Sequence, residues 1–266
     1  MKQLQFTYDM TFEFDAEIAK HYYSLKCFPY DTARQEICSL NYTVFPAGNT
    51  NQDFDSYGNK MVLGYIEQPH TLFAASITGT VTTGNDIYEE KGSPTQTLLF
   101  RNQSERTVPG EVLQAYYAKL PLFRYKAAYD KAFFIMKQLH RDFQYVQGVT
   151  DIQTTAEQAM ALGKGVCQDY AHIMLALCRM AKIPARYVVG MMVGEGFSHA
   201  WVEVLSNGFW YGMDPTNDML VQEDYIKISH GRDYRDTIVN KGSFLGAAKQ
   251  KQTIRVIVKE RNGRND

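Results

Sequence analysis

The period of the apolar residues changes twice along this 266-residue chain. At the start of the chain apolar and polar side chains alternate, most clearly over residues 4–10, and this is the two-residue period of a β-strand. From Pro109 to Lys182 the patterns are mainly helical, and strand patterns return at Arg186. Helices followed by strands predict an α+β domain behind an N-terminal antiparallel β-domain.

Residues 85–107 separate the two patterns. This segment holds Gly, Pro, Ser and charged residues with weak periodicity, as a boundary between domains does. We therefore expect an N-terminal β-domain over residues 1–106 and a second domain over residues 107–266. In the second domain the helices come first, an antiparallel sheet follows, and residues 253–258 form its last strand.

The composition excludes some classes of partner. Charged residues make up 21% of the chain and the net charge is -1, with Lys and Arg scattered among Asp and Glu. This balance gives no reason to expect nucleic acid or an anionic membrane as a partner. The N-terminus lacks the continuous apolar run of a signal peptide, and no stretch approaches a membrane span, so we expect a cytoplasmic protein.

One of the four cysteines, Cys167, has the surroundings of a nucleophile. Gly163 and Gly165 before it allow a sharp turn and a close approach of the backbone. A helical pattern starts at Cys167, and the unpaired N–H groups and the dipole of a helix N-terminus favour a thiolate over a thiol. The same N–H groups can hold the oxyanion of a tetrahedral intermediate. The other three fit small buried hydrophobic residues: Cys27, Cys38 and Cys178.

A predicted hairpin brings a candidate base and a candidate acid together. His199 starts a strand on which Trp201 and Glu203 share its face, and the Asn-Gly pair at 207–208 is a hairpin turn signal. Residues at equal distances from such a turn pair across it, which places Asp214 opposite the start of the His199 strand. Asp214 can then accept one ring N–H of His199 and fix its tautomer, while the imidazole takes the proton of the thiol.

Several of these residues also fit other roles. Asp214 precedes a proline and fits a turn residue, and Trp201 fits either the core or a wall of the site. Asp169 and Tyr170 either line the pocket or satisfy the backbone. A zinc site from Cys167, His199, Asp214 and His172 lacks paired-ligand spacing, so we expect no metal and no cofactor. The candidates for the substrate pocket are Gly165, Val166, Gln168, Asp169, Tyr170 and Trp201.

Together these motifs resemble the transglutaminase-like superfamily. The matching residues are Gly165, Cys167, Asp169, Tyr170 and Ala171 in G-x-C-x-D-Y-A, His199, Ala200, Trp201 and Glu203 in H-A-W-V-E-V, and Asp214, Pro215, Thr216 and Asn217 in D-P-T-N. Residues 231–236 look like the G-R-D-Y-x-D signature of the bacterial branch, and residues 55–62 resemble the D-x-x-G-N segment of its N-terminal domain. The proline that usually follows G-R-D-Y-x-D is missing from residues 237–241. The resemblance covers nearly the whole chain.

The resemblance implies a papain-like core and a triad of Cys167, His199 and Asp214 that forms an acyl-enzyme with a peptide or protein amide. Members of the bacterial branch are often described as cysteine proteases, so we expect a peptidase or amidase. An amine acceptor would make the protein a transglutaminase, and a small acyl donor would make it an acyltransferase. A non-catalytic protein-binding module on the same fold is the alternative outside enzymes. We expect residues 231–236 to form a structural ion-pair cluster, with a substrate-contacting loop as the alternative. We expect no calcium control, because the sequence has no recognisable acidic loop.

Overall fold

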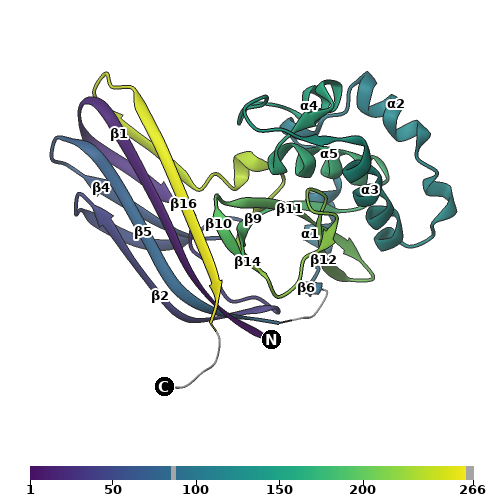
Figure 1. Ribbon diagram of the computed structural model, residues 1–266, viewed down its shortest axis with the longest axis horizontal. Coiled ribbons are helices and arrows are strands. Elements are labelled where there is room, and N and C mark those ends of the chain that lie inside the picture. The colour runs from purple at the N-terminus through teal and green to yellow at the C-terminus, as the bar shows by residue number, and fades with distance from the viewer. Residues whose placement is uncertain (85–87, 262–266) are drawn as a thin grey trace.

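The computed structural model describes residues 1–84 and 88–261. It has two lobes: long strands form the left-hand lobe in Figure 1, and helices packed on a second sheet form the right-hand lobe. The architecture is α+β, as the sequence predicts. Within the described residues, no helix is long and apolar enough to span a membrane.

The left-hand lobe is an eight-stranded antiparallel sheet built around one long strand, β1. Its strands are β1 (Lys2–Leu25), β2 (Gln35–Phe45), β3 (Asn49–Phe54), β4 (Lys60–Ile66), β5 (His70–Thr83), β10 (Gly194–Gly196), β15 (Asn240–Leu245) and β16 (Gln250–Glu260). The first half of β1 pairs with β5 and β16, and its second half pairs with β4 and β15. Between Glu13 and Ile18 the register shifts, so that β1 leaves one set of partners and joins the other.

The alternation seen at the start of the sequence explains how this sheet is oriented. The even-numbered side chains from Leu4 to Phe14 are buried, and the odd-numbered ones between them are partly or fully exposed. Each even residue lies beside a residue of β16 on the same face, for example Met10 beside Ile254. One face of the sheet therefore turns toward the core, and the other turns toward solvent.

The right-hand lobe is a second antiparallel sheet covered by helices. Its strands, in spatial order, are β13 (Met219–Leu220), β12 (Phe209–Asp214), β11 (His199–Ser206), β9 (Ala185–Met192) and β14 (Tyr225–Gly231), with β6 (Tyr88–Lys91) paired to β12. The helices are α1 (Pro94–Arg101), α2 (Glu111–Lys119), α3 (Ala128–Asp142), α4 (Ala156–Leu162) and α5 (Cys167–Met180). Two short parallel strands, β7 (Gln144–Tyr145) and β8 (Lys164–Gly165), lead into α5, and single 3₁₀ turns cover Glu105–Thr107, Leu122–Arg124 and Tyr234–Asp236.

Helix α5 is the centre of this lobe. It packs against β9 and β11 on one side and against α3 and α4 on the other. Its fully buried side chains include Ala171, Met174, Leu175 and Cys178. Thr155 caps α4, and Gly163 ends it in the left-handed conformation with φ of 70°. These caps fix the place where the chain turns into α5.

The structure corrects the expected place of the last strand. Residues 253–258 belong to β16, which pairs with β1 in the left-hand sheet and not with the strands of the second sheet. Conversely, β6 and α1, which come before residue 107, lie in the right-hand lobe. The chain thus crosses between the lobes more than once, and the division at residue 106 stays a prediction.

Candidate active site

Cys167 lies at the first position of α5, where the sequence predicts it. Val166 before it is extended, and its side chain cannot cap the helix. Asp169 supplies the polar contact instead, because its Oδ2 accepts the N–H of Val166 at 2.7 Å and the hydroxyl of Thr150 at 2.7 Å. Asp169 is fully buried and holds the turn before the nucleophile in place.

Gly165 is required by this contact. A Cβ at Gly165 would lie 2.3 Å from Oδ2 of Asp169, which is closer than any real Cβ contact. Only glycine lets the carboxylate reach back to the backbone. Burial raises the pKa of Asp169, while the hydrogen bonds from Thr150 and Val166 act against that rise. The Gly-x-Cys-x-Asp pattern therefore shapes the helix start.

The hairpin forms with the register that the sequence predicts. Asn207 and Gly208 both have positive φ, at 51° and 82°, as a two-residue turn requires. Val202 pairs with Met213, so the next step of the register places Asp214 opposite Trp201. His199 Nε2 lies 2.7 Å from Oδ2 of Asp214.

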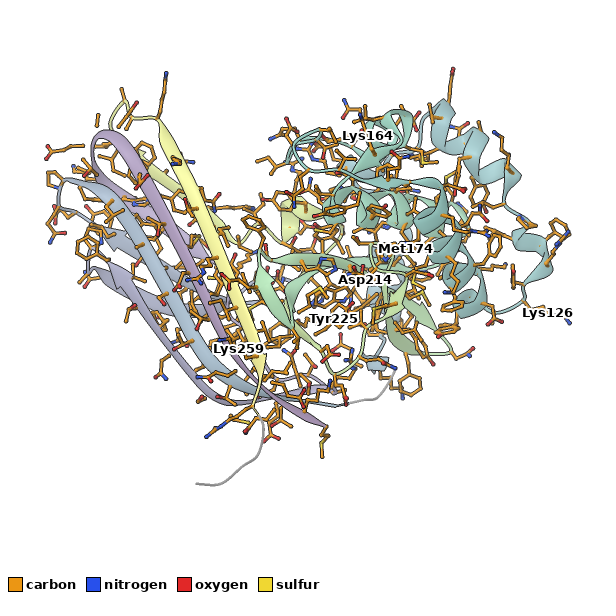
Figure 2. The ribbon with its side chains drawn as sticks, viewed as in Figure 1. Lys126, Lys164, Met174, Asp214, Tyr225 and Lys259 are labelled. Carbon is orange, nitrogen blue, oxygen red and sulfur yellow. The ribbon has the colours of Figure 1, made fainter. Side chains whose placement is uncertain are left out.

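Asp214 is surrounded by donors. Its Oδ2 also accepts the side-chain N–H of Asn217 at 2.7 Å and the hydroxyl of Tyr225 at 2.9 Å, and its Oδ1 accepts the backbone N–H of Thr216 at 2.9 Å. Figure 2 shows Asp214 and Tyr225 close together in the right-hand lobe. Burial alone would raise the pKa of Asp214, but the contacts with His199, Asn217 and Tyr225 lower it below its usual value. Asp214 is thus held as a carboxylate.

His199 lies between this carboxylate and the thiol. Burial alone would lower the pKa of His199, but its hydrogen bonds with Asp214 and Cys167, and their charges, raise it to about 10. Because Nε2 is engaged by Asp214, the ring nitrogen left for Cys167 is Nδ1. A buried imidazole with this bias readily takes the proton of the thiol.

Cys167 and His199 open into a cavity of about 320 Å³. Two of the residues expected to line the pocket, Val166 and Gln168, do line it, and Gly165, Asp169, Tyr170 and Trp201 do not. The lining also contains Tyr234 of the G-R-D-Y-x-D signature and five residues that belong to no motif: Tyr145, Tyr187, Val189, Phe197 and Ile254. No spacing marks them as a set, because they come from separate elements.

Tyr170 and Trp201 support the site from behind. The Tyr170 hydroxyl donates to the carbonyl of Phe143 at 2.5 Å in the interior. Trp201 is fully buried, and its ring centroid lies 6.4 Å from that of His199 and 5.5 Å from that of Tyr225. Trp201 therefore packs behind the imidazole.

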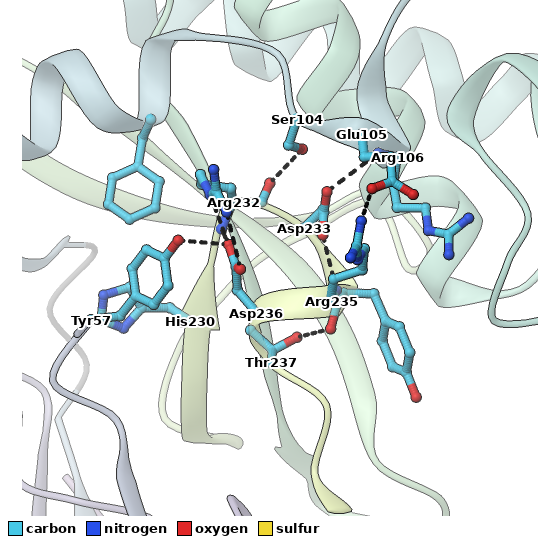
Figure 3. A network of polar contacts seen from close by, with 12 residues as sticks. Tyr57, Ser104, Glu105, Arg106, His230, Arg232, Asp233, Arg235, Asp236 and Thr237 are labelled. Atoms are coloured by element: carbon cyan, nitrogen blue, oxygen red, sulfur yellow. Dashed lines mark hydrogen bonds and ion pairs between the residues drawn. The ribbon is translucent and has the colours of Figure 1, made fainter. Parts of the chain in front are cut away.

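Residues 231–236 form the polar network of Figure 3. Asp236 accepts from the guanidinium Nε of Arg232 at 2.9 Å and from the hydroxyl of Tyr57 at 2.7 Å, while Arg235 pairs with Glu105. Asp233 accepts the backbone N–H of Arg106 at 3.3 Å.

The segment at residues 55–62, which resembles the second bacterial signature, contacts the chain directly before residues 231–236. Asn59 donates its side-chain N–H to the carbonyl of His230 and accepts the N–H of the same residue, both at 2.8 Å. Asp55, in the same loop, pairs with Lys26 at 2.6 Å. The two signatures thus join the lobes next to the site, consistent with the expected structural cluster.

Comparison with known proteins agrees with this architecture. The profile of the "Bacterial transglutaminase-like N-terminal region" matches residues 4–82, and that of the "Transglutaminase-like superfamily" matches residues 123–215. Residues 123–215 thus belong to the transglutaminase-like superfamily, and residues 4–82 match the N-terminal region of bacterial transglutaminase-like proteins. Among the relatives of this transglutaminase-like protein is "Uncharacterized protein ML0607" of Mycobacterium leprae, 28% identical over 243 residues, which cover 82% of this chain and 84% of the relative.

"Uncharacterized protein Rv2569c" of Mycobacterium tuberculosis is also 28% identical, over 240 residues that cover 78% of this chain and 76% of the relative. The crystal structure of a "Putative Cysteine Protease" from Cytophaga hutchinsonii superposes with a TM-score of 0.81 at 22% identity. That superposition covers 100% of this chain and 92% of the other. At this level of identity the likeness shows the fold.

Proposed function

We propose that this transglutaminase-like protein is a cysteine-dependent enzyme that cleaves amide bonds through an acyl-enzyme on Cys167, as a peptidase or amidase. The observation that supports it best is that Cys167 and His199 line one cavity and that Nε2 of His199 lies 2.7 Å from Oδ2 of Asp214. A buried structural thiol would not require a histidine whose second ring nitrogen is held by a carboxylate.

The steps follow from this geometry. His199 takes the proton of Cys167, and the thiolate attacks the carbonyl carbon of the amide, forming a C–S bond and a tetrahedral oxyanion. The imidazolium then gives its proton to the amide nitrogen, the C–N bond breaks, and the amine leaves. Water, deprotonated by His199, attacks the thioester, and the carboxylic acid leaves as the thiol forms again. Asp214 keeps the imidazole in one tautomer throughout.

The start of α5 provides donors for the oxyanion. The amides of Asp169 and Tyr170 bond to the carbonyl of Val166 at 2.9 and 3.1 Å. The amides of Cys167 and Gln168 come earlier in the helix and have no intrahelical carbonyl to bond. They are the two N–H groups that can point at an oxyanion formed beside the sulfur.

Water is the default acceptor in this site, because the Cys167 side chain is partly exposed. A transglutaminase would instead join the acyl group to an amine. The two activities can be distinguished by incubating an amide substrate with and without an excess of hydroxylamine and comparing the masses of the products. Hydrolysis yields mainly the acid, whereas a transglutaminase yields mainly the hydroxamate.

The triad can be tested without a substrate. The rate of iodoacetamide alkylation at Cys167 would be measured by peptide mass spectrometry from about pH 5 to about pH 9, on both sides of the ordinary free-thiol pKa of about 8.5. We expect fast alkylation on the acid side of that value, and loss of this fast reaction in His199→Ala.

Cys38 is the internal reference in the same experiment. Contrary to the burial expected from the sequence, it is an exposed thiol in β2, and its alkylation should not differ between wild type and His199→Ala. If Cys167 follows the profile of Cys38 in wild type and in His199→Ala, the thiol is not activated. A non-catalytic binding module would then be the better description of the protein.

A further inference from the structure

Three hollows adjoin one another between the two lobes. The central one, with Cys167 and His199, shares its rim at Tyr145 and Phe197 with a second hollow of about 410 Å³. On the other side it shares Tyr234 and Gln252 with a third hollow of about 180 Å³. The nucleophile thus lies within a groove that continues in both directions.

A single strand, β16, runs along the left-hand wall of this groove. Gln250 and Gln252 line the third hollow, Gln252 and Ile254 the central one, and Val256 the second. These are alternate residues of one strand, so their side chains share one face. In Figure 1, β16 is the long yellow strand that faces the right-hand lobe. The left-hand lobe therefore supplies one side of the candidate active site.

The length of this wall fits a polypeptide segment. From Gln250 to Val256 the strand rises about 20 Å, at about 3.3 Å per residue, which equals the span of about six residues of an extended substrate. A small amide would occupy only the middle of the groove. Because the groove continues on both sides of Cys167, a bound chain can extend beyond the scissile bond in both directions.

The central hollow is mostly apolar, and among the described residues that line it His199 is the only one that carries a positive charge. These residues include no Asp, Glu, Lys or Arg. Aromatic and aliphatic side chains such as Tyr187, Val189 and Ile254 form most of the walls, and the polar part comes from Ser198 and three glutamines, Gln147, Gln168 and Gln252. Burying an unpaired charged side chain against such walls is costly, whereas an apolar side chain of leucine size gains free energy there. The hollow therefore selects an uncharged apolar side chain.

We propose, building on the proposed function, that the substrate is an extended polypeptide segment bound along β16, with an apolar side chain beside the scissile bond seated in the central hollow against Ile254. The left-hand lobe is then part of the substrate-binding site, and the enzyme cleaves within chains. Folded segments and single amino-acid amides are poor substrates, because neither fills the groove.

The test uses protection of Cys167 from iodoacetamide, together with cleavage, and both are read by mass spectrometry on the full chain. The probes are an uncharged octapeptide with a central leucine, the same octapeptide with a central aspartate, and leucine amide. We expect the leucine octapeptide to protect and to be cleaved at least about tenfold better than the other two, the range of discrimination that apolar pockets achieve.

Ile254→Arg and Thr253→Arg form a matched pair of variants. Thr253 is the neighbouring residue on the opposite face of β16 and is exposed, so Thr253→Arg should keep the preference for leucine. In Ile254→Arg the new cation should reverse the preference toward the aspartate octapeptide, a gain that a misfolded protein cannot show. Alkylation of Cys167 without peptide should match wild type in Thr253→Arg.

The two proposals fail in different ways. The groove proposal would be overturned if all three probes protected Cys167 equally, or if the preference did not change in Ile254→Arg. If alkylation were fast and dependent on His199 in the same experiment, the triad proposal would remain intact. Slow alkylation in the absence of peptide would overturn the triad. Protection by the leucine octapeptide would still show that the groove binds polypeptide.

Discussion

Two buried carboxylates in the same sheet have different kinds of hydrogen-bond partner. Asp214 and Glu203 both have fully buried side chains. Glu203, on β11, accepts from the guanidinium of Arg186 at 2.5 Å and from the ammonium of Lys227 at 2.8 Å. Asp214, on the adjacent strand β12, accepts from His199, whose ring reaches the cavity.

Both carboxylates are held ionised. Burial would raise the pKa of Glu203, but Arg186 and Lys227 lower it, and Asp214 is lowered by its own donors in the same way. The partners differ in their surroundings, because Arg186 and Lys227 are buried in the core and the ring of His199 reaches the cavity beside Cys167. We therefore expect Glu203 to stabilise the fold, and Asp214 to influence the reactivity of Cys167 as well.

The largest effect on stability should come from Glu203→Gln. The substitution keeps the size of the side chain but leaves Arg186 and Lys227 buried with too little negative charge, which should cost about 3–5 kcal/mol of unfolding free energy. Urea unfolding measures the loss. Glu195→Gln is the control, since its pair with Arg255 is exposed and should contribute no more than about 1 kcal/mol. Equal urea midpoints for Glu203→Gln and wild type would contradict the structural role of Glu203.

Asp214→Asn should also destabilise the protein, because its donors lose a carboxylate, but unlike Glu203→Gln it should in addition change the reactivity of Cys167 strongly. Loss of the carboxylate removes contacts that raise the pKa of His199, so the imidazole is a weaker acceptor for the proton of Cys167 in slightly acidic buffer. Alkylation of Cys167 at pH 6 should slow by about 10- to 100-fold, the effect of one or two pKa units. A normal alkylation rate in a folded Asp214→Asn protein would show that Asp214 does not orient the imidazole.

The two carboxylates should also differ in their dependence on pH. Because the pKa of His199 rises from 6.5 to about 10 on folding, its contribution to stability is complete below pH 6.5 and is lost as the pH rises through 10. The stability difference between wild type and His199→Gln should therefore shrink as the pH is raised from 6 toward 10, a range set by these pKa values. The difference between wild type and Glu203→Gln should stay constant over that range. Urea unfolding at several pH values tests both expectations.

Local patterns in the sequence predict the parts of the site that lie within one element or one hairpin. The helix start at Cys167, the turn at Asn207 and the facing of His199 and Asp214 each depend on residues close in the chain. The sequence left two roles open for Asp169, lining the pocket or satisfying the backbone. Its contact with the Val166 amide in the structure favours the second role.

The sequence could not predict which strands pair when they lie far apart in the chain. The alternation of residues 253–258 predicts a strand, but a period of two does not tell which sheet the strand joins. Tyr225 reaches Asp214 only because β14 lies in the same sheet as β12, and no spacing in the sequence predicts this contact. For the same reason Ile254 could not be recognised as a wall of the cavity.

The smallest effect is expected from Tyr225→Phe, which removes one donor to Asp214 and leaves the ring in place. Losing one hydrogen bond to a carboxylate should cost about 1.5–3 kcal/mol at most, and the alkylation rate of Cys167 at pH 6 should fall severalfold. Tyr57→Phe is the matched control, because Tyr57 donates to the carboxylate of Asp236 at 2.7 Å away from the cavity. It should lower stability by a similar amount and leave the alkylation rate unchanged. Equal alkylation rates in the two variants would mean that Tyr225 only stabilises the fold, and that Asp214 holds His199 without its help.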